Sequence, residues 1–205
     1  MARPPDPGIR TNLRDQAVDY VLAHGVGDLS LRPLAKALKT NARMLVYHFG
    51  SREGLMREIL SGARERGDAR IQAWFQSGEK PRTLPQFLRW YWKRVGVPRT
   101  RPMIRLAFEL YALALRNPGE YPGVLEDPIA YWRMLTEKAG ISSELNDVEA
   151  TLMLAATRGL LLDLCATGDH ARVGRAWEAL AQFVEWRMPS TRRHDGKPKG
   201  KRLVV

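Results

Sequence analysis

The sequence predicts an all-α protein with an N-terminal three-helix unit and a larger C-terminal helical unit. Apolar residues recur at helical spacing of three and four along most of the 205 residues. Glycine, proline and capping residues punctuate these segments where helices are expected to begin and end. No segment shows the strict apolar–polar alternation of a half-buried strand. Together these three observations favour helices throughout.

The chain is expected to divide into three parts. Residues 1–66 form the first unit, residues 67–188 the second, and residues 189–205 a disordered basic tail without apolar periodicity. A long helix from Arg52 to about Phe75 is expected to link the two units. Its apolar residues lie towards its two ends and flank a polar centre from Arg64 to Arg70. This pattern is typical of a helix that lies half in each unit.

The first helix is expected from about Gly8 or Ile9 to His24, where Gly25 ends it. The stretch from Leu29 to Leu55 then predicts two short helices before the long one. Ser30 and Asn41 are suited to cap the two short helices, Gly50 ends the second, and Ser51 caps the long helix. The apolar face of the first short helix is carried by four residues: Leu31, Leu34, Ala35 and Leu38.

The second short helix, about Ala42 to His48, is expected to turn one side inward and leave the other outward. The residues expected inward are Leu45, Val46 and Phe49. Those expected outward are Arg43, Met44, Tyr47 and His48. Two short helices across a tight turn, followed by a long helix, form the plan of a helix-turn-helix DNA reader. The second short helix would be the recognition helix.

This segment resembles the DNA-binding domain of the TetR (tetracycline repressor) family of bacterial transcription regulators. The strongest part is the run Val46–Phe49 followed by Gly50–Leu55, which matches the family pattern Y-x-F then S-[KR]-[ED]-x-L. Further matching residues are Ala17, Gly25, Ser30, Leu34 and Ala35. Two positions depart from the pattern: Lys39 stands where many members have glycine, and Arg52 where lysine is more usual.

The resemblance implies a regulator that binds a palindromic DNA operator as a homodimer and acts as a ligand-responsive repressor. Four residues are candidates for contact with base edges: Thr40, Asn41, Arg43 and Met44. Six are candidates for phosphate contact: Ser30, Arg32, Lys39, Tyr47, His48 and Arg52. Arg43 is the best candidate for a bidentate contact to guanine, because its guanidinium matches the O6 and N7 acceptors.

The C-terminal unit is expected to contain five helices. The segment from Pro102 to Arg116 is apolar nearly all round, which predicts a buried helix. The last two helices begin near Asn146 and Asp169, and the resemblance implies that they pair with their twins in the homodimer. Three small residues would allow that close packing: Ala155, Ala156 and Gly159. Asp163 is expected to form an ion pair at the dimer interface, with Arg158 as the candidate partner, or to face water.

The resemblance also implies a small-molecule pocket in the C-terminal unit, for an effector of unknown identity. Such a ligand must prefer a conformer whose two recognition helices no longer match successive major grooves. Six aromatic residues are candidate lining: Trp90, Tyr91, Phe108, Tyr111, Tyr131 and Trp132. Ordinary core or dimer packing is at least as good an explanation for each of them singly.

Charge and motif content indicate the kind of partner and argue against an enzyme. The net charge is +11, and the basic excess lies in residues 1–66, with 11 basic against 7 acidic side chains, and in residues 189–205, with 6 against 1. A polyanionic partner is therefore expected. No catalytic motif, cofactor motif or metal-ligand spacing is found, so an enzyme is not expected. The single Cys165 and the lack of a signal peptide or long apolar run favour a cytoplasmic protein without a membrane span.

Two other functions stay open at the level of the sequence. One is a helical small-molecule-binding protein without specific DNA binding. The other is a sequence-indifferent nucleic-acid binder that uses the basic arm and tail.

Overall fold

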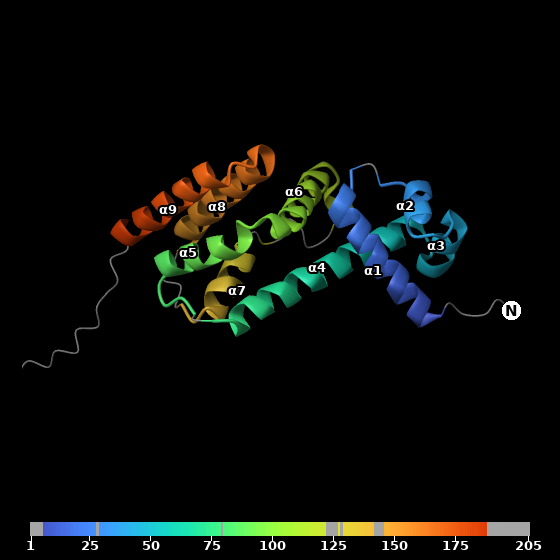
Figure 1. Cartoon of the computed structure of the whole chain (residues 1–205), viewed down its shortest axis with the longest axis horizontal. Helices are drawn as coiled ribbons and strands as arrows, with labels where there is room; N and C mark the ends of the chain where they lie inside the picture. Colours follow the sequence, from blue (N-terminus) through green and yellow to red (C-terminus); the bar gives the residue numbers. More distant parts are fainter. Residues whose placement is uncertain are drawn as a thin grey trace, which may run out of the picture.

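The structure, a computed structural model, describes residues 6–27, 29–78, 80–121, 127, 129–141 and 146–187. Within these ranges it contains α-helices, two short 3₁₀ helices and no strand, which confirms the predicted all-α class. The molecule is elongated, with α1, α2 and α3 gathered at one end and α5, α7, α8 and α9 at the other (Figure 1). The predicted basic tail, residues 189–205, lies outside the described residues.

The N-terminal end is built from four helices. They are α1 (Pro7–His24), α2 (Leu31–Ala37), α3 (Ala42–Phe49) and α4 (Arg52–Gln76). The C-terminal end contains α5 (Leu84–Val95), η1 (Pro98–Thr100), α6 (Arg101–Arg116), η2 (Pro118–Glu120), α7 (Ala130–Lys138), α8 (Asp147–Thr167) and α9 (His170–Arg187).

The helix ends follow the capping residues that the sequence indicated. The Asn41 side chain accepts a hydrogen bond from the Met44 N–H at 2.9 Å, and Ser51 Oγ accepts one from the Gly54 N–H at 3.0 Å. Gly25 ends α1 at a φ of 86°, in a region that favours glycine. Ser30 is the N-cap residue of α2, but its side chain makes no capping hydrogen bond.

Two hydrophobic cores hold the chain, and α4 contributes to both. Leu55, Ile59 and Ala63 lie in the core formed with α1, α2 and α3. Ile71 and Phe75, further along α4, lie in the core formed with α5, α7, α8 and α9. The polar centre expected for α4 therefore lies between the residues that it contributes to the two cores, in the middle of the long helix in Figure 1.

Helix α6 differs from the expectation of a wholly buried helix. Only Leu106 and Ala114 are buried, and Leu115 is 61% exposed. The apolar residues of α6 pack against different parts of the molecule: Leu106 lies in the N-terminal core, whereas Phe108 packs against the C-terminal core. A helix that contacts two cores carries apolar residues on more than one side, which explains the misleading sequence pattern.

The end of α1 is joined to α6 by specific hydrogen bonds. The Glu109 carboxylate accepts a hydrogen bond from the Val26 N–H at 2.7 Å. Arg105 donates to the carbonyl oxygens of Leu22 and Ala23 at 3.2 and 3.0 Å. These contacts satisfy backbone groups that the end of α1 leaves open. They form a second connection between the two ends of the molecule, beside α4.

Helix α8 is long and apolar enough to cross a membrane by length and composition alone, with a mean hydropathy of 1.3. One side of α8 lies in the C-terminal core through Met153, Leu154 and Leu161, and the helix packs along α9. A core helix passes the same test, so the finding is weak evidence for a membrane span.

Candidate nucleic-acid interface and regulatory core

Helix α3 is held in place by one buried side and by a close backbone approach to α4. Leu45 is fully buried and Phe49 is 7% exposed. A Cβ atom added at Gly54, in the first turn of α4, would lie well inside 3.0 Å of the Phe49 carbonyl oxygen. Only glycine therefore fits where α4 passes the end of α3. This contact sets the angle at which α3 is presented.

The outward side of α3 differs from the prediction at two positions. Val46 was expected inward but is 39% exposed, and His48 was expected outward but is 6% exposed. The buried residues Leu45, His48 and Phe49 are spaced three and four apart, so they share one side of the helix. His48 packs edge-on against Tyr47 and near Phe49, and neither of its ring nitrogens has a hydrogen-bond partner among the described residues.

The exposed surface of α3 is formed by Arg43, Met44, Val46 and Tyr47, of which Met44 is 38% and Tyr47 42% exposed. Val46 is the one member of this surface that the sequence analysis missed. In an eight-residue helix the apolar side is too short to distinguish Val46 from His48 by periodicity. An α-helix with its side chains is about 10–12 Å across, which suits the ~12 Å width of a DNA major groove.

The turn between α2 and α3 brings further predicted contact residues beside this surface. Lys39 is exposed and has a φ of 54°, the one positive value at a non-glycine residue in the described part of the chain. Thr40 donates its N–H to the Ala35 carbonyl, which closes the turn. Asn41 is exposed, but its side-chain oxygen is already engaged as the cap of α3.

The predicted phosphate-contact residues outside α3 are also on the surface. Ser30 and Arg32 are exposed at the start of α2, and Arg52 is exposed at the start of α4. The Arg52 guanidinium donates one hydrogen bond to the Leu29 carbonyl at 3.1 Å. Since a guanidinium has five N–H donors, most of them remain open to another acceptor.

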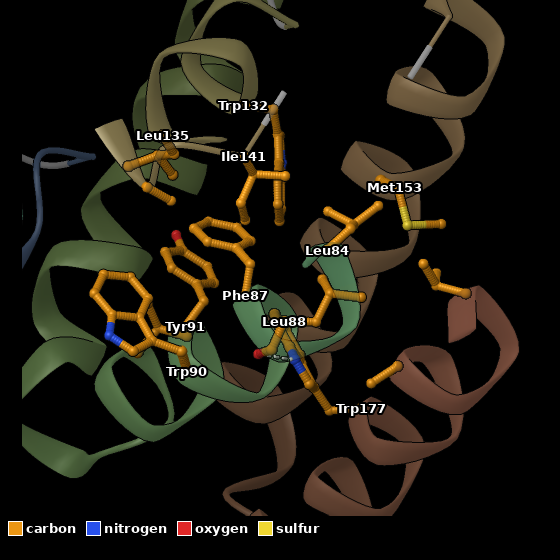
Figure 2. Close-up of a cluster of buried hydrophobic side chains, with 14 of the residues drawn as sticks. Leu84, Phe87, Leu88, Trp90, Tyr91, Trp132, Leu135, Ile141, Met153 and Trp177 are labelled. Carbon is orange, nitrogen blue, oxygen red and sulfur yellow. Dashed lines mark hydrogen bonds between the residues drawn. The ribbon is translucent and has the colours of Figure 1, made fainter. Parts of the chain in front are cut away.

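The C-terminal core is rich in aromatic rings, which Figure 2 shows as a continuous cluster. Phe87 lies 5.8 Å from Tyr91 and 5.6 Å from Trp132, measured between ring centroids. Tyr91 lies 6.1 Å from Trp177, whose indole N–H donates to the Leu88 carbonyl at 2.8 Å. These distances are those of well-packed aromatic pairs. The cluster is filled by its own side chains.

The structure brings most of the predicted effector residues to this cluster, but not all. Trp90, Tyr91 and Trp132 are buried members, and Phe108 packs against them. Tyr131 is 40% exposed, yet burial of its hydroxyl raises its pKa. Tyr111 lies elsewhere, with the Arg158 guanidinium 5.1 Å from its ring centroid.

Polar groups inside the cluster are few and strongly desolvated. Burial raises the pKa of Tyr91 well above its ordinary value, and the hydroxyl of Tyr131 lies close to it. The Trp90 indole N–H is buried without a hydrogen-bond partner among the described residues. The Arg94 guanidinium covers the Trp90 ring at 3.9 Å from its centroid, and burial lowers the pKa of this arginine.

Helices α8 and α9 present a second apolar side that no other described residue covers. Five large apolar residues on it are 52–77% exposed: Val148, Leu152, Leu162, Phe183 and Trp186. Ala155 and Gly159, predicted to face a partner, are exposed on α8, and a Cβ atom added at Gly159 would meet nothing within 4 Å. A hollow of about 430 Å³ lies on this side, between Leu152 and Phe183.

Asp163 on α8 is engaged within its own chain. Both of its carboxylate oxygens accept hydrogen bonds from Arg172 of α9, at 2.7 and 2.8 Å. This pair lowers the pKa of Asp163. It connects α8 to α9 within one chain, because α9 turns back directly after Gly168. Among the described residues no group of three or more His, Cys, Asp or Glu side chains could hold a metal ion.

Comparisons with known proteins add a fold-level identification. No protein-family model and no curated protein sequence matches the chain. Among solved structures, the multidrug binding protein EbrR in complex with imidazole is 26% identical, with a TM-score of 0.60, and the match covers 89% of this chain and 93% of that one. A TetR-like transcriptional regulator from Rhodococcus sp. RHA1 is 22% identical, with a TM-score of 0.56, over 92% of this chain and all of that one.

A third solved structure, Salmonella enterica GusR, is 20% identical, with a TM-score of 0.54, and the match covers 88% of this chain and 97% of that one. The two latter identities are low enough that they speak for the fold alone. All three matches extend over both ends of the molecule and so include the C-terminal helices, where the sequence resemblance was weakest. The chain has the fold of the TetR-like transcriptional regulators, as its helix-turn-helix sequence indicated.

Proposed function

We propose that this protein is a sequence-specific DNA-binding transcriptional regulator, and that it acts as a ligand-responsive repressor on a palindromic operator. In this proposal residues 1–66 bind DNA and residues 67–188 regulate and dimerise. The observation that carries it is the exposure of α3. Arg43, Met44, Val46 and Tyr47 form an exposed helical surface, and the preceding helix and turn carry the exposed cations Arg32 and Lys39.

Each part of this surface has a role. Arg43 would read guanine in the major groove, with Thr40, Asn41 and Met44 beside it. Ser30, Arg32, Lys39, Tyr47 and Arg52 would hold phosphates and set the register of the protein on the duplex. His48 is left out of this set because its ring is buried. Its position between Tyr47 and Phe49 supports packing of α3 instead.

We propose that a second copy of the chain covers the exposed apolar side of α8 and α9. A contiguous exposed surface formed by five large apolar side chains is typical of an interaction site. Helices from two copies would form a four-helix bundle in which Ala155 and Gly159 permit close approach. A two-fold dimer presents two recognition helices, which can match half-sites one helical turn, about 34 Å, apart.

Ligand response is supported by the aromatic cluster and by one structural neighbour, EbrR, which is a multidrug binding protein. The rings of Trp90, Tyr91 and Trp132 offer flat apolar surfaces, and the Trp90 N–H offers an unused donor. Because the cluster is filled, a ligand would enter only where these rings separate. It would therefore select a conformer other than this one.

The first experiment selects bound duplexes from a random DNA pool at ~0.15 M salt, near physiological ionic strength. Enrichment of a palindrome is the expected result. Binding at low salt without any consensus would favour the sequence-indifferent binder. A lack of binding at either salt would favour the small-molecule-binding protein without specific DNA binding.

Point variants then separate the two kinds of contact. Arg52→Ala is expected to weaken binding to all sequences and to lower the salt dependence, because a phosphate contact is lost. Arg43→Ala is expected to cost about 1–3 kcal/mol on the preferred sequence and to relax the preference at one base pair. Arg82→Ala is the matched control, since its side chain is exposed far along the chain from α3. Wild-type binding by both test variants would refute the assignment of α3.

A further inference from the structure

A crevice of about 260 Å³ lies where the two ends of the molecule meet. Its walls come from the last turns of α1, the middle of α4, the 3₁₀ helix η1 and the first turn of α6. Leu22, Pro102 and Met103 provide an apolar wall, and Arg70 and Arg99 provide two guanidinium groups. The crevice is separate from the aromatic cluster and from the exposed surface of α3.

The two arginines of the crevice differ from their neighbours in having no partner among the described residues. Arg66 pairs with Asp19 at 2.5 Å, and Arg105 donates to backbone carbonyls at the end of α1. Arg70 and Arg99, in contrast, make no hydrogen bond or ion pair with any residue that the structure describes. The one carboxylate of the wall, Asp19, is already engaged by Arg66. Within the described part of the chain, the crevice therefore carries two guanidinium groups without an ion-pair partner.

We propose that this crevice binds a small organic oxyanion, with its carboxylate or phosphate group on Arg70 and Arg99 and its apolar body against Leu22, Pro102 and Met103. Guanidinium groups match the planar oxygens of carboxylates and phosphates and form charge-assisted hydrogen bonds with them. The volume of the crevice is smaller than that of typical drug-sized sites, about 300–1,000 Å³. The ligand class is accordingly a single-ring or short-chain acid.

The position of the crevice gives such a ligand a means of regulation. It contacts α1 on one side and α6 on the other, and two of its lining residues, Leu22 and Ala23, accept the hydrogen bonds from Arg105 of α6. A ligand that binds more tightly to one relative position of α1 and α6 shifts the population towards that position. This consequence for DNA affinity depends on the proposed function, whereas binding of the anion does not.

The test is a calorimetric titration of the full chain, without DNA, with three probes of similar shape. Benzoate carries a carboxylate, phenyl phosphate carries a phosphate, and benzyl alcohol is uncharged. We expect at least one anion to bind with a Kd of about 1 mM or tighter, and the alcohol to bind at least ten-fold more weakly. Tighter binding of benzoate identifies a carboxylate ligand, and tighter binding of phenyl phosphate identifies a phosphate ligand.

Variants connect the signal to the crevice. Arg70→Gln and Arg99→Gln are each expected to raise the Kd of the preferred anion about ten-fold, which corresponds to a loss of one charge-assisted contact. Arg82→Gln, an exposed arginine outside the crevice, is expected to bind like the parent. Thermal melts establish that all variants are folded. An unchanged Kd in the double variant Arg70→Gln/Arg99→Gln would overturn the proposal, and so would a parent protein that binds neither anion.

These outcomes are independent of the random-pool selection. A chain that binds benzoate but no DNA would refute the proposed regulator and keep the anion site. A chain that selects a palindrome but binds no anion would do the reverse.

Discussion

The substitution of alanine at two glycines of α4 should have opposite effects on stability. Gly54 and Gly67 are both helical, so alanine gains about 1 kcal/mol of helix propensity at either site. At Gly67 nothing lies within 4 Å of the added Cβ, and the full gain should be realised. At Gly54 the added Cβ would overlap the Phe49 carbonyl oxygen, which is backbone and cannot rotate away.

The size of the Gly54→Ala effect follows from that overlap. Relief requires the end of α3 to move away from α4 by more than a few tenths of an ångström, and overpacking of this kind costs about 1–3 kcal/mol or more. The net result should be a loss of up to about 2 kcal/mol, against a gain of about 1 kcal/mol for Gly67→Ala. Because Phe49 ends α3, Gly54→Ala should also weaken DNA binding, whereas Gly67→Ala should leave it unchanged.

Urea unfolding followed by far-ultraviolet circular dichroism measures both variants on one scale. Equal midpoints for Gly54→Ala and Gly67→Ala would refute the reasoning, since the two substitutions differ only in what the new methyl group meets. A shift in slope without a shift in midpoint would also contradict it.

Three further predictions concern a hydrogen bond, a proposed dimer surface and an ion pair. Glu109→Ala should lower the free energy of unfolding by about 1–3 kcal/mol, because the buried Val26 N–H loses its acceptor. Glu109→Gln keeps an acceptor and should restore most of that free energy. Equal urea midpoints for the two variants would contradict this prediction. Trp186→Arg should convert the proposed dimer to a monomer in analytical ultracentrifugation, and a dimer of unchanged stability would remove α9 from the interface. Arg89 holds the pKa of Glu178 below its ordinary value of 4.5. The stability that this ion pair contributes is therefore fully present above about pH 4.5 and is lost as the pH falls through the lowered pKa of Glu178. Arg89→Gln should therefore weaken the acid dependence of thermal melts, and an unchanged dependence would contradict the assignment.

The helices could be predicted from the sequence because their ends carry their own signals. Asn146 and Glu149 form a capping box where α8 was expected to begin, and Asp169 accepts a hydrogen bond from the Arg172 N–H at the start of α9. Such signals are local, so they survive without knowledge of the fold. The linking role of α4 was also predictable, since its apolar residues divide into two groups.

Orientation was harder to predict wherever a helix has more than one apolar side. In α3 the choice between Val46 and His48 depends on what packs beside each, and a short helix gives too few residues to decide. In α6 the residues that face the two cores follow one another in sequence, and together they imitate a fully buried helix. The crevice with Arg70 and Arg99 could not be predicted at all, because it is assembled from four separate segments.

The N-terminal core has one member from far along the chain, and this affects how a nascent chain can fold. All of its buried residues lie between Leu13 and Ala63 except Leu106. Residues 6–63 can therefore begin to pack as soon as they leave the ribosome, since domains generally fold as units from the N-terminus. Their core stays open on one side until Leu106 has been synthesised. The helix that closes it, α6, also carries Glu109, so both the N-terminal core and the contact with Val26 are completed only after part of the C-terminal end has been synthesised.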